Sequence, residues 1–297
     1  MNNFNDLIIK NDLIVKKYTL KGKALIIDTP KDKYVLKSGN NVKLFKYLYS
    51  KEFDSFPKVI DYNRENTIYE YIDDIKYDEE ERALDLIKYI ALLHKKTSYY
   101  KEITEFEYKK LYESLISKID ESFNYYNDLV NIIENKIYPS PSEYLLLRNI
   151  SFVFSLIYYS KNKLNEFYEK YKNEKRKRVV TLHNNVDTSN LLKNDKTYLI
   201  SWDKNTIGSP INDIINFYNK RALDFDFISL VTEYEKINPL TSLEKDLYLI
   251  NISLVDKISF TKKEYEDTHN IRMFLDKVFK SNEILQFEEK EKSTNEE

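Results

Sequence analysis

The stretch Val179–Leu192, with the sequence VVTLHNNVDTSNLL, is the most informative part of this chain. Its apolar ends flank a run of short polar side chains from His183 to Asn190. The β-branched residues before this run and the segment Lys196–Trp202 after it predict two short strands. The sequence therefore predicts a polar loop held between strands, which is a common position for functional residues. Two adjacent asparagines lie near the start of the loop, where a catalytic loop would use carboxylates.

Composition excludes several classes of protein. The chain has 297 residues, a formal net charge of −2 and no cysteine. This balance gives no electrostatic basis for a nucleic-acid partner, and the lack of cysteine excludes disulfides and thiolate metal sites. Charge occurs too early for a signal peptide, and no apolar run approaches the ~20 residues of a membrane span. We therefore expect a cytoplasmic protein. With only three glycines, it has no phosphate-cradling glycine loop.

The first part of the chain has the pattern of a small β-sheet lobe. Short β-prone runs separated by turn residues predict strands over 12–20, 23–30, 32–38, 57–62 and 67–72. Apolar residues at helical spacing predict one helix over 42–53. We expect these elements to form an antiparallel lobe of residues 1–73.

The rest of the chain is predicted to be mostly helical. The segment DEEERALDLIKYIALLHKKT begins with acids and ends with bases, the order that a helix dipole favours. Long helices are predicted over 104–137 and 142–171, and another begins at Pro210. We expect a helical lobe of residues 74–285 and a disordered charged tail of residues 286–297. The fold class predicted is α+β.

Three motifs occur in a recognisable order. The chain reads HNNVDTSN at His183–Asn190, ISWD at Ile200–Asp203 and GSPIND at Gly208–Asp213, after YVLK at Tyr34–Lys37 and YEYIDD at Tyr69–Asp74. This order resembles the aminoglycoside phosphotransferase and choline kinase superfamily, and within it the bacterial spore-coat kinase-like proteins. Members read H-G-D-x-x-x-x-N, I-D-W/F-(D/E) and G-D-P-x-x-D at these places. The resemblance implies a bilobal protein-kinase-like fold, with a small antiparallel N-lobe containing one helix and a larger helical C-lobe across a cleft.

Under this resemblance, two acids are missing. His183 and Asn190 fix the register of the loop, so the position of the catalytic base falls on Asn185. In the second motif the metal-binding position falls on Ser201. A neutral amide does not accept a proton at neutral pH, and a hydroxyl is a poorer ligand for Mg²⁺ than a carboxylate. The resemblance also implies that His183 and Asp213 brace the loop, and that Asn190 contacts nucleotide and metal.

The resemblance also implies a cofactor site. Lys37 corresponds to the lysine that orients nucleotide phosphates, while Glu70 and Ile72 lie in the expected hinge. In the family this lysine pairs with a glutamate from the helix of the small lobe. The acids between Lys37 and the next strand are Glu52 and Asp54, at the far end of that helix. Either Lys37 lacks its ion pair or the glutamate position is misaligned.

Two acids lie two positions beyond the missing ones. Asp187 follows Asn185, and Asp203 follows Ser201. If residues 201–203 are extended, Asp203 returns to the face of Ser201 about 6–7 Å away and points toward the cleft. Asp203 is then a candidate substitute metal ligand, and Asp187 a candidate substitute base.

The sequence therefore favours a pseudokinase that acts by binding or scaffolding, with ATP and Mg²⁺ binding weakened or lost. The resemblance suggests a spore association, and a protein partner is left open. The alternative is an atypical ATP-dependent small-molecule phosphotransferase that uses Asp203 and Asp187. A third reading is an interaction protein that binds no nucleotide.

Overall fold

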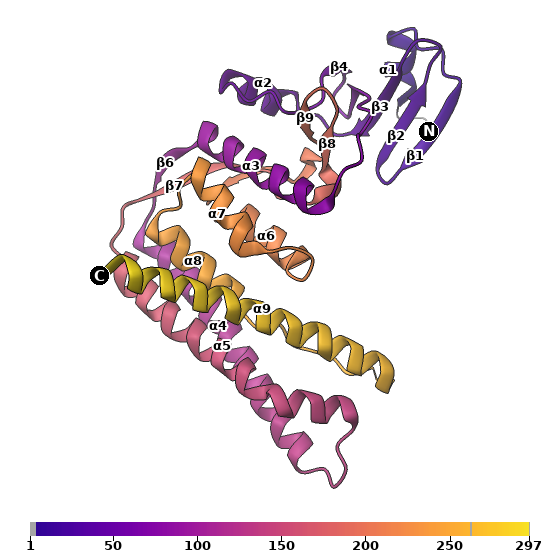
Figure 1. Ribbon diagram of the computed structural model, residues 1–297. Helices are drawn as coiled ribbons and strands as arrows, with labels where there is room; N and C mark the ends of the chain where they lie inside the picture. Colours follow the sequence, from indigo (N-terminus) through magenta and orange to yellow (C-terminus); the bar gives the residue numbers. More distant parts are fainter. Residues whose placement is uncertain (1–3, 262, 297) are drawn as a thin grey trace. The chain divides into compact units, whose positions relative to one another are not determined.

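The computed structural model describes residues 4–261 and 263–296 (Figure 1). The chain forms two compact units. The first unit contains the described residues through Ser98, with Val180–Gly208 and Lys236–Asn238. The second unit contains Tyr99–Val179, Ser209–Glu235 and the described residues from Pro239 onward. This division does not coincide with the expected boundary at residue 74, because the next helix and the polar loop belong to the sheet unit. Residues 1–3 of the expected N-terminal lobe lie outside the described residues.

The first unit is built on a five-stranded antiparallel sheet in the order β1-β2-β3-β5-β4. The strands are β1 (Lys17–Lys21), β2 (Ala24–Asp28), β3 (Lys33–Ser38), β4 (Val59–Tyr62) and β5 (Asn66–Glu70). Helix α2 (Val42–Ser50) connects β3 to β4. The predicted sequence of three strands, one helix and two strands is therefore confirmed. A turn at Gly22, whose φ is +59°, joins β1 to β2.

A short helix that the sequence did not predict covers the core of this sheet. Helix α1 (Asn5–Lys10) inserts Leu7 into a cluster of buried residues from three strands, Leu25, Ile27, Leu36 and Ile68. Its end is tied to β4, because Lys10 Nζ and Asn11 Nδ2 donate hydrogen bonds to the Asp61 carboxylate at 2.9 and 2.8 Å. The helix has no side-chain cap, which explains why no local signal marks it.

The remaining elements of the first unit surround the polar loop. Helix α3 (Glu79–Thr97) begins at Asp78, whose carboxylate accepts from Glu80 N and Glu81 N. The loop is followed by a hairpin of β8 (Leu191–Lys193) and β9 (Thr197–Leu199). Strand β10 (Thr206–Gly208) pairs with the second half of β7 (Arg176–Leu182). Strands β8, β9 and β10 have three residues each. The strand predicted over Lys196–Trp202 corresponds to β9 and is therefore much shorter than expected.

The second unit is helical. Helices α4, α5, α8 and α9 pack together, with α5 against each of the other three (Figure 1). The helices of its described residues are α4 (Glu105–Glu134), α5 (Pro141–Tyr171), α6 (Ile211–Arg221), α7 (Phe227–Ile237), α8 (Ser242–Ile252) and α9 (Glu264–Glu296). Capping boxes begin α4, α5 and α8, and each satisfies two orphan N–H groups of a first turn. Strand β6 (Tyr99–Glu102) pairs with the first half of β7.

The charged C-terminal segment is helical. Helix α9 continues through Glu296, whereas the sequence predicted disorder over 286–297, whose last residue lies outside the described range. Its glutamates, lysines and glutamine are strong helix formers, although their charge resembles that of a disordered tail. Within the part of the chain that the structure describes, every helix is too short or too polar to cross a membrane.

Candidate functional site

The polar loop begins with a buried histidine. His183 Nε2 lies 2.9 Å from Ile200 O, and the His183 ring meets the Trp202 ring edge-on with centroids 4.7 Å apart. Trp202 is itself fixed, because its Nε1 donates to Leu199 O at 2.8 Å. His183 therefore connects the first residue of the loop to the segment that contains Ser201.

Asn184 shapes the start of the loop. Its φ is +56°, a left-handed conformation that asparagine tolerates better than most residues. Its Nδ2 donates to Lys204 O at 3.0 Å and to Thr206 Oγ1 at 2.6 Å. The family motif has glycine at this place. The prediction of site residues missed Asn184, although an asparagine in a glycine position is itself a signal for a left-handed backbone.

Asn190 closes the loop from its other end. Its Nδ2 donates to Asn185 O at 2.9 Å, and its backbone O accepts from Ile200 N at 3.0 Å. The structure therefore brings Asn185, Asn190 and the segment after β9 together. Backbone carbonyls accept both of these hydrogen bonds, and the side-chain amide of Asn190 donates one of them.

The displaced acid Asp187 stabilises the turn of the loop. It precedes a short 3₁₀ helix, Thr188–Asn190, and its carboxylate accepts from Ser189 N at 3.1 Å and Ser189 Oγ at 2.9 Å. These are the contacts of a helix cap. Asp187 therefore has a structural role in the loop, and its predicted role as a substitute base stays a prediction.

Lys37 lies near the end of β3, opposite Thr67 of β5. Its Nζ donates to Ser201 Oγ at 3.2 Å, across 164 positions of sequence. Burial lowers the pKa of Lys37, and the negative charge of Asp203 partly opposes that effect. The cation is thus half-buried beside a neutral hydroxyl, where the family would place a carboxylate.

No glutamate pairs with Lys37 among the described residues. Helix α2 contains no acid. Glu52 lies 3.7 Å from Lys96, and Asp54 lies 3.3 Å from Lys196. Both acids that the sequence offered are therefore associated with other lysines.

Ser201 and Asp203 lie in an irregular segment. Ser201 has a φ of +67° and precedes the 3₁₀ helix Trp202–Lys204. The expected strand geometry is wrong here, because the left-handed residue ends the extended backbone. Asp203 is exposed, yet its charge acts on Lys37 and also on Tyr69. Burial and then this charge raise the pKa of Tyr69 to about 12, so the charge of Asp203 acts on both Lys37 and Tyr69.

Aromatic rings hold α2 against this segment. Phe45 of α2 stacks on Phe56 at 4.5 Å and meets both Tyr69 and Trp202 edge-on at 6.1 Å. Phe53 meets Trp202 at 6.3 Å. These offset and edge-on geometries are the favourable ones for aromatic pairs. Packing of rings therefore connects the helix to the site without an ion pair to Lys37.

The expected hinge lies at the end of β5. Glu70 Oε1 accepts from Lys58 N at 2.7 Å, so this side chain is used within the sheet. Ile72 follows β5 and is half-buried. No contact described for either residue is specific to a cofactor, and their predicted cofactor role stays a prediction.

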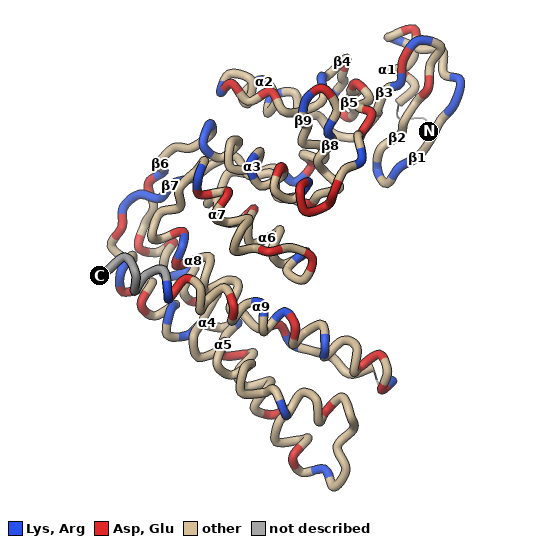
Figure 2. The backbone as a smooth tube through the Cα atoms, viewed as in Figure 1, with Lys and Arg blue, Asp and Glu red and all other residues tan. Residues whose placement is uncertain are grey.

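The residues after the hinge form a charged network. Arg82 is buried and donates to Asp74 Oδ2 at 2.9 Å, Leu191 O at 3.1 Å and Ile75 O at 3.1 Å. The other Asp74 oxygen accepts from Lys193 N at 2.9 Å. The network fixes the linker to α3 and to the strand after the polar loop. Beyond this network, further acids lie in the first turn of α3 (Figure 2).

Asp213 is fully buried in the first turn of α6. It belongs to the second unit, whereas the polar loop belongs to the first. Its role as a brace of the loop therefore stays a prediction.

The resemblance places a magnesium ligand at Ser201, and the weakening or loss of that metal site stays a prediction. Among the described residues, no three histidine or acidic side chains are grouped to hold a metal. The metal position is the hydroxyl of Ser201, which accepts from Lys37. Carboxylates are the preferred ligands of this hard cation, and the charge of one acid, Asp203, acts on Lys37.

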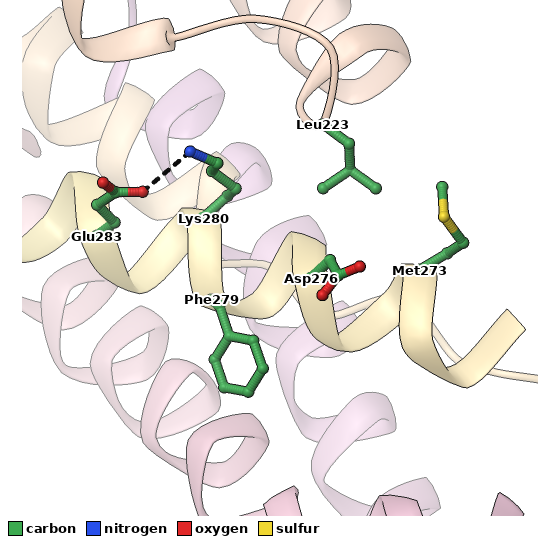
Figure 3. A pocket seen from close by; sticks show the side chains of 6 residues that line it. All are labelled: Leu223, Met273, Asp276, Phe279, Lys280 and Glu283. Carbon is green, nitrogen blue, oxygen red and sulfur yellow. Dashed lines mark hydrogen bonds and ion pairs between the residues drawn. The ribbon is translucent and has the colours of Figure 1, made fainter. Parts of the chain in front are cut away.

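The second unit has a separate open pocket of about 430 Å³ (Figure 3). It is lined by Leu223, Met273, Asp276, Phe279, Lys280 and Glu283. Lys280 Nζ and Glu283 Oε2 pair at 3.2 Å on its rim. None of its residues belongs to the predicted motifs.

Comparisons with known proteins show a structural likeness only. No family model matches the chain, and no curated protein matches its sequence. An aminoglycoside phosphotransferase from Alicyclobacillus acidocaldarius matches with a TM-score of 0.62 and 11% identity over 93% of each chain. The AMP-bound spectinomycin phosphotransferase APH(9)-Ia matches with a TM-score of 0.54 and 12% identity, over 93% of this chain and 97% of its own. Choline kinase LicA from Streptococcus pneumoniae has a TM-score of 0.47 at 15% identity.

The predicted fold class is thereby confirmed. The chain has an α+β, protein-kinase-like fold, with an antiparallel sheet toward its N-terminus and a helical C-terminal part, as in the aminoglycoside phosphotransferase structures.

Proposed function

We propose that this protein is a pseudokinase, which uses the phosphotransferase fold for binding or scaffolding. The contact between Lys37 Nζ and Ser201 Oγ, at 3.2 Å, carries the proposal. It joins the phosphate-orienting lysine to the position where a carboxylate would hold the metal. Since that position is a hydroxyl, Lys37 meets a neutral group there.

The chemistry of phosphoryl transfer supports this reading. The reaction depends on positioned charge and on metal ions that neutralise the developing charge of the transferred group. Here the base position is the amide of Asn185, and the metal position is Ser201. Asp187 caps the turn of the loop. With both acids replaced by neutral groups, the site loses most of the stabilisation that would drive the transfer.

Binding is less affected than transfer. A phosphate oxygen would replace Ser201 Oγ as the acceptor for Lys37, exchanging a neutral hydrogen bond for a stronger charge-assisted one. The aromatic contacts of Phe45, Tyr69 and Trp202 keep α2 in place without an ion pair. We therefore propose weak nucleotide binding that needs no divalent cation. The resemblance of the motifs to spore-coat kinase-like proteins supports a spore-associated scaffold as its setting.

One observation favours a second candidate, an atypical phosphotransferase. The charge of Asp203 acts on both Lys37 and Tyr69, so one carboxylate lies near the phosphate site. In this alternative, Asp203 replaces the missing metal ligand for an ATP-dependent transfer to a small molecule.

A thermal-shift series distinguishes the candidates. The purified protein is melted with ATP in EDTA and with ATP plus Mg²⁺, beside Lys37→Met and Asp203→Asn. A ligand at 100 times its Kd adds about 2.7 kcal/mol of stability. The pseudokinase predicts a metal-independent shift that Lys37→Met abolishes and Asp203→Asn preserves. A shift that requires both Mg²⁺ and Asp203 would favour the enzyme. No shift under any condition would leave a protein that binds no nucleotide.

A further inference from the structure

Strand β1 forms an open edge of the five-stranded sheet. It pairs with β2 on one side only, and each of its five residues is exposed. Leu20 is 74% exposed and Tyr18 is 45% exposed. The described part of the chain places no strand on the other side of β1.

The apolar face of the sheet continues onto this edge. In the register of the hairpin, Leu20 lies opposite Leu25 and Tyr18 lies opposite Ile27. Cross-strand partners share a face, and both Leu25 and Ile27 belong to the buried core. Leu20 and Tyr18 thus extend the core face beyond the residues that cover it.

The backbone of these two residues faces outward. In a hairpin with a two-residue turn, the flanking pair, here Lys21 and Ala24, exchanges both hydrogen bonds. Bonded and non-bonded pairs alternate along β1. The N–H and C=O groups of Tyr18 and Leu20 are therefore directed to the open edge, in the geometry that binds an additional strand.

The charge of the edge selects the partner. Lys16, Lys17, Lys21 and Lys23 surround the exposed strand, and none forms an ion pair with a described residue. Basic residues appear at both ends of β1 (Figure 2). In the register centred on Thr19, which covers the whole strand, an antiparallel second copy would place Lys17 opposite Lys21 twice, and this is destabilising. Self-association is therefore disfavoured.

We propose that β1 is the docking edge for an extended acidic segment of another protein. This segment would add a sixth strand to the sheet. Its acids would lie beside Lys17 and Lys21 on one face, and its apolar residues would cover Tyr18 and Leu20 on the other. The proposal is independent of the nucleotide site.

The test uses a labelled antiparallel probe with the core sequence Glu-Val-Thr-Val-Glu, flanked by glycine and serine. The fluorescence anisotropy of the probe, titrated with the full chain, should show saturable binding whose affinity falls as the salt concentration rises. The amide signals of Tyr18 and Leu20 should shift most in an NMR titration. A matched probe with lysine in place of glutamate should not bind.

Variants separate strand pairing from simple charge attraction. Leu20→Pro removes an outward N–H, which an edge strand tolerates, and should abolish binding without changing the melting temperature. The double variant Lys17→Glu, Lys21→Glu should bind the acidic probe about tenfold or more weakly than the wild type does. It should also bind the lysine probe. Should Leu20→Pro not fold, a probe N-methylated on the amides that face β1 tests the same pairing with the unchanged protein.

Three results would overturn the proposal. The first is no saturable binding of the acidic probe. The second is equal binding by the N-methylated and unmodified probes, which would mean charge attraction alone. The third is a dimer in analytical ultracentrifugation that Leu20→Pro dissociates, which would make a second copy the occupant.

Discussion

Two basic side chains of the first unit have opposite surroundings. Arg82 is buried and is matched by the Asp74 carboxylate and two backbone carbonyls. Lys37 is half-buried and donates to the neutral hydroxyl of Ser201. The chain keeps complementary charge where the architecture must be held together. Under the proposed function, it lacks that charge where a phosphotransferase would need it.

The largest expected effect comes from breaking the matched cation. Arg82→Met would remove the ion pair of Asp74 and the Arg82 donor from two carbonyls, while the exposed Asp74 would still accept from Lys193 N. The loss of this buried donor leaves its acceptors unsatisfied, so we expect the free energy of unfolding to fall by about 2 kcal/mol. Chemical denaturation of both proteins measures this. A loss below about 0.5 kcal/mol, the range of ordinary surface substitutions, would mean that the network does not hold the linker.

A negative charge introduced beside Lys37 should make its surroundings resemble those of Arg82. Ser201→Asp places a carboxylate beside Lys37, which raises the pKa of Lys37 and supplies a ligand that Mg²⁺ prefers. We expect ATP to bind about tenfold more tightly with Mg²⁺ than in EDTA, equivalent to about 1.4 kcal/mol. Isothermal titration measures both affinities, with Ser201→Asn as the neutral control. Equal affinities of Ser201→Asp for ATP with and without Mg²⁺ would show that the missing acid alone does not explain the proposed loss of metal-dependent binding.

Removing Lys37 should cost the fold little. Its pKa is lowered mainly by burial, so the charged form is disfavoured in the folded state. We expect Lys37→Met to be as stable as the wild type or more stable by up to about 1 kcal/mol.

The stability difference between Lys37→Met and the wild type should depend on pH. The desolvation cost is complete at neutral pH, where lysine is charged in both states, and it disappears as the pH rises through the lowered pKa toward about 10.4. The advantage of Lys37→Met should shrink over that interval in parallel unfolding curves. A variant clearly less stable at neutral pH would show that Lys37 holds the sheet unit together.

The smallest effect concerns the attachment of α1. Hydrogen bonds from Lys10 and Asn11 lower the pKa of Asp61. A lowered carboxyl pKa contributes stability above its ordinary range of about 4, and this contribution is lost as the pH falls through the lowered value. Wild type should exceed Asp61→Asn by less than about 1 kcal/mol at pH 7, and the two should converge in acid. A difference that persists in acid would have another origin.

The sequence predicts regular elements better than the irregular site. The strands of the sheet have alternating patterns and turn residues, and the long helices have caps and proline boundaries, so both were found. Helix α1 has six residues and no side-chain cap, and β8 and β10 have three residues each. Tertiary contacts, which sequence periodicity does not report, determine these short elements.

The site divides in the same way. The register of the motifs located Lys37, Asn190 and Ser201, and the structure brings Lys37 and Ser201 into contact. The register of the motifs did not predict the left-handed backbone at Ser201. This residue ends the extended backbone on which the predicted orientation of Asp203 depended. The aromatic contacts of Phe45 also escaped prediction, because they join residues far apart in the chain.

The formation of ADP tests the central claim most directly. Purified wild type in excess over ATP, with Mg²⁺ present, is followed over many hours, beside an Asn185→Asp, Ser201→Asp double variant. We predict that the wild type forms ADP no faster than protein-free buffer. ADP formation by the wild type that is lost in Asp203→Asn would contradict the account and establish a working phosphotransferase.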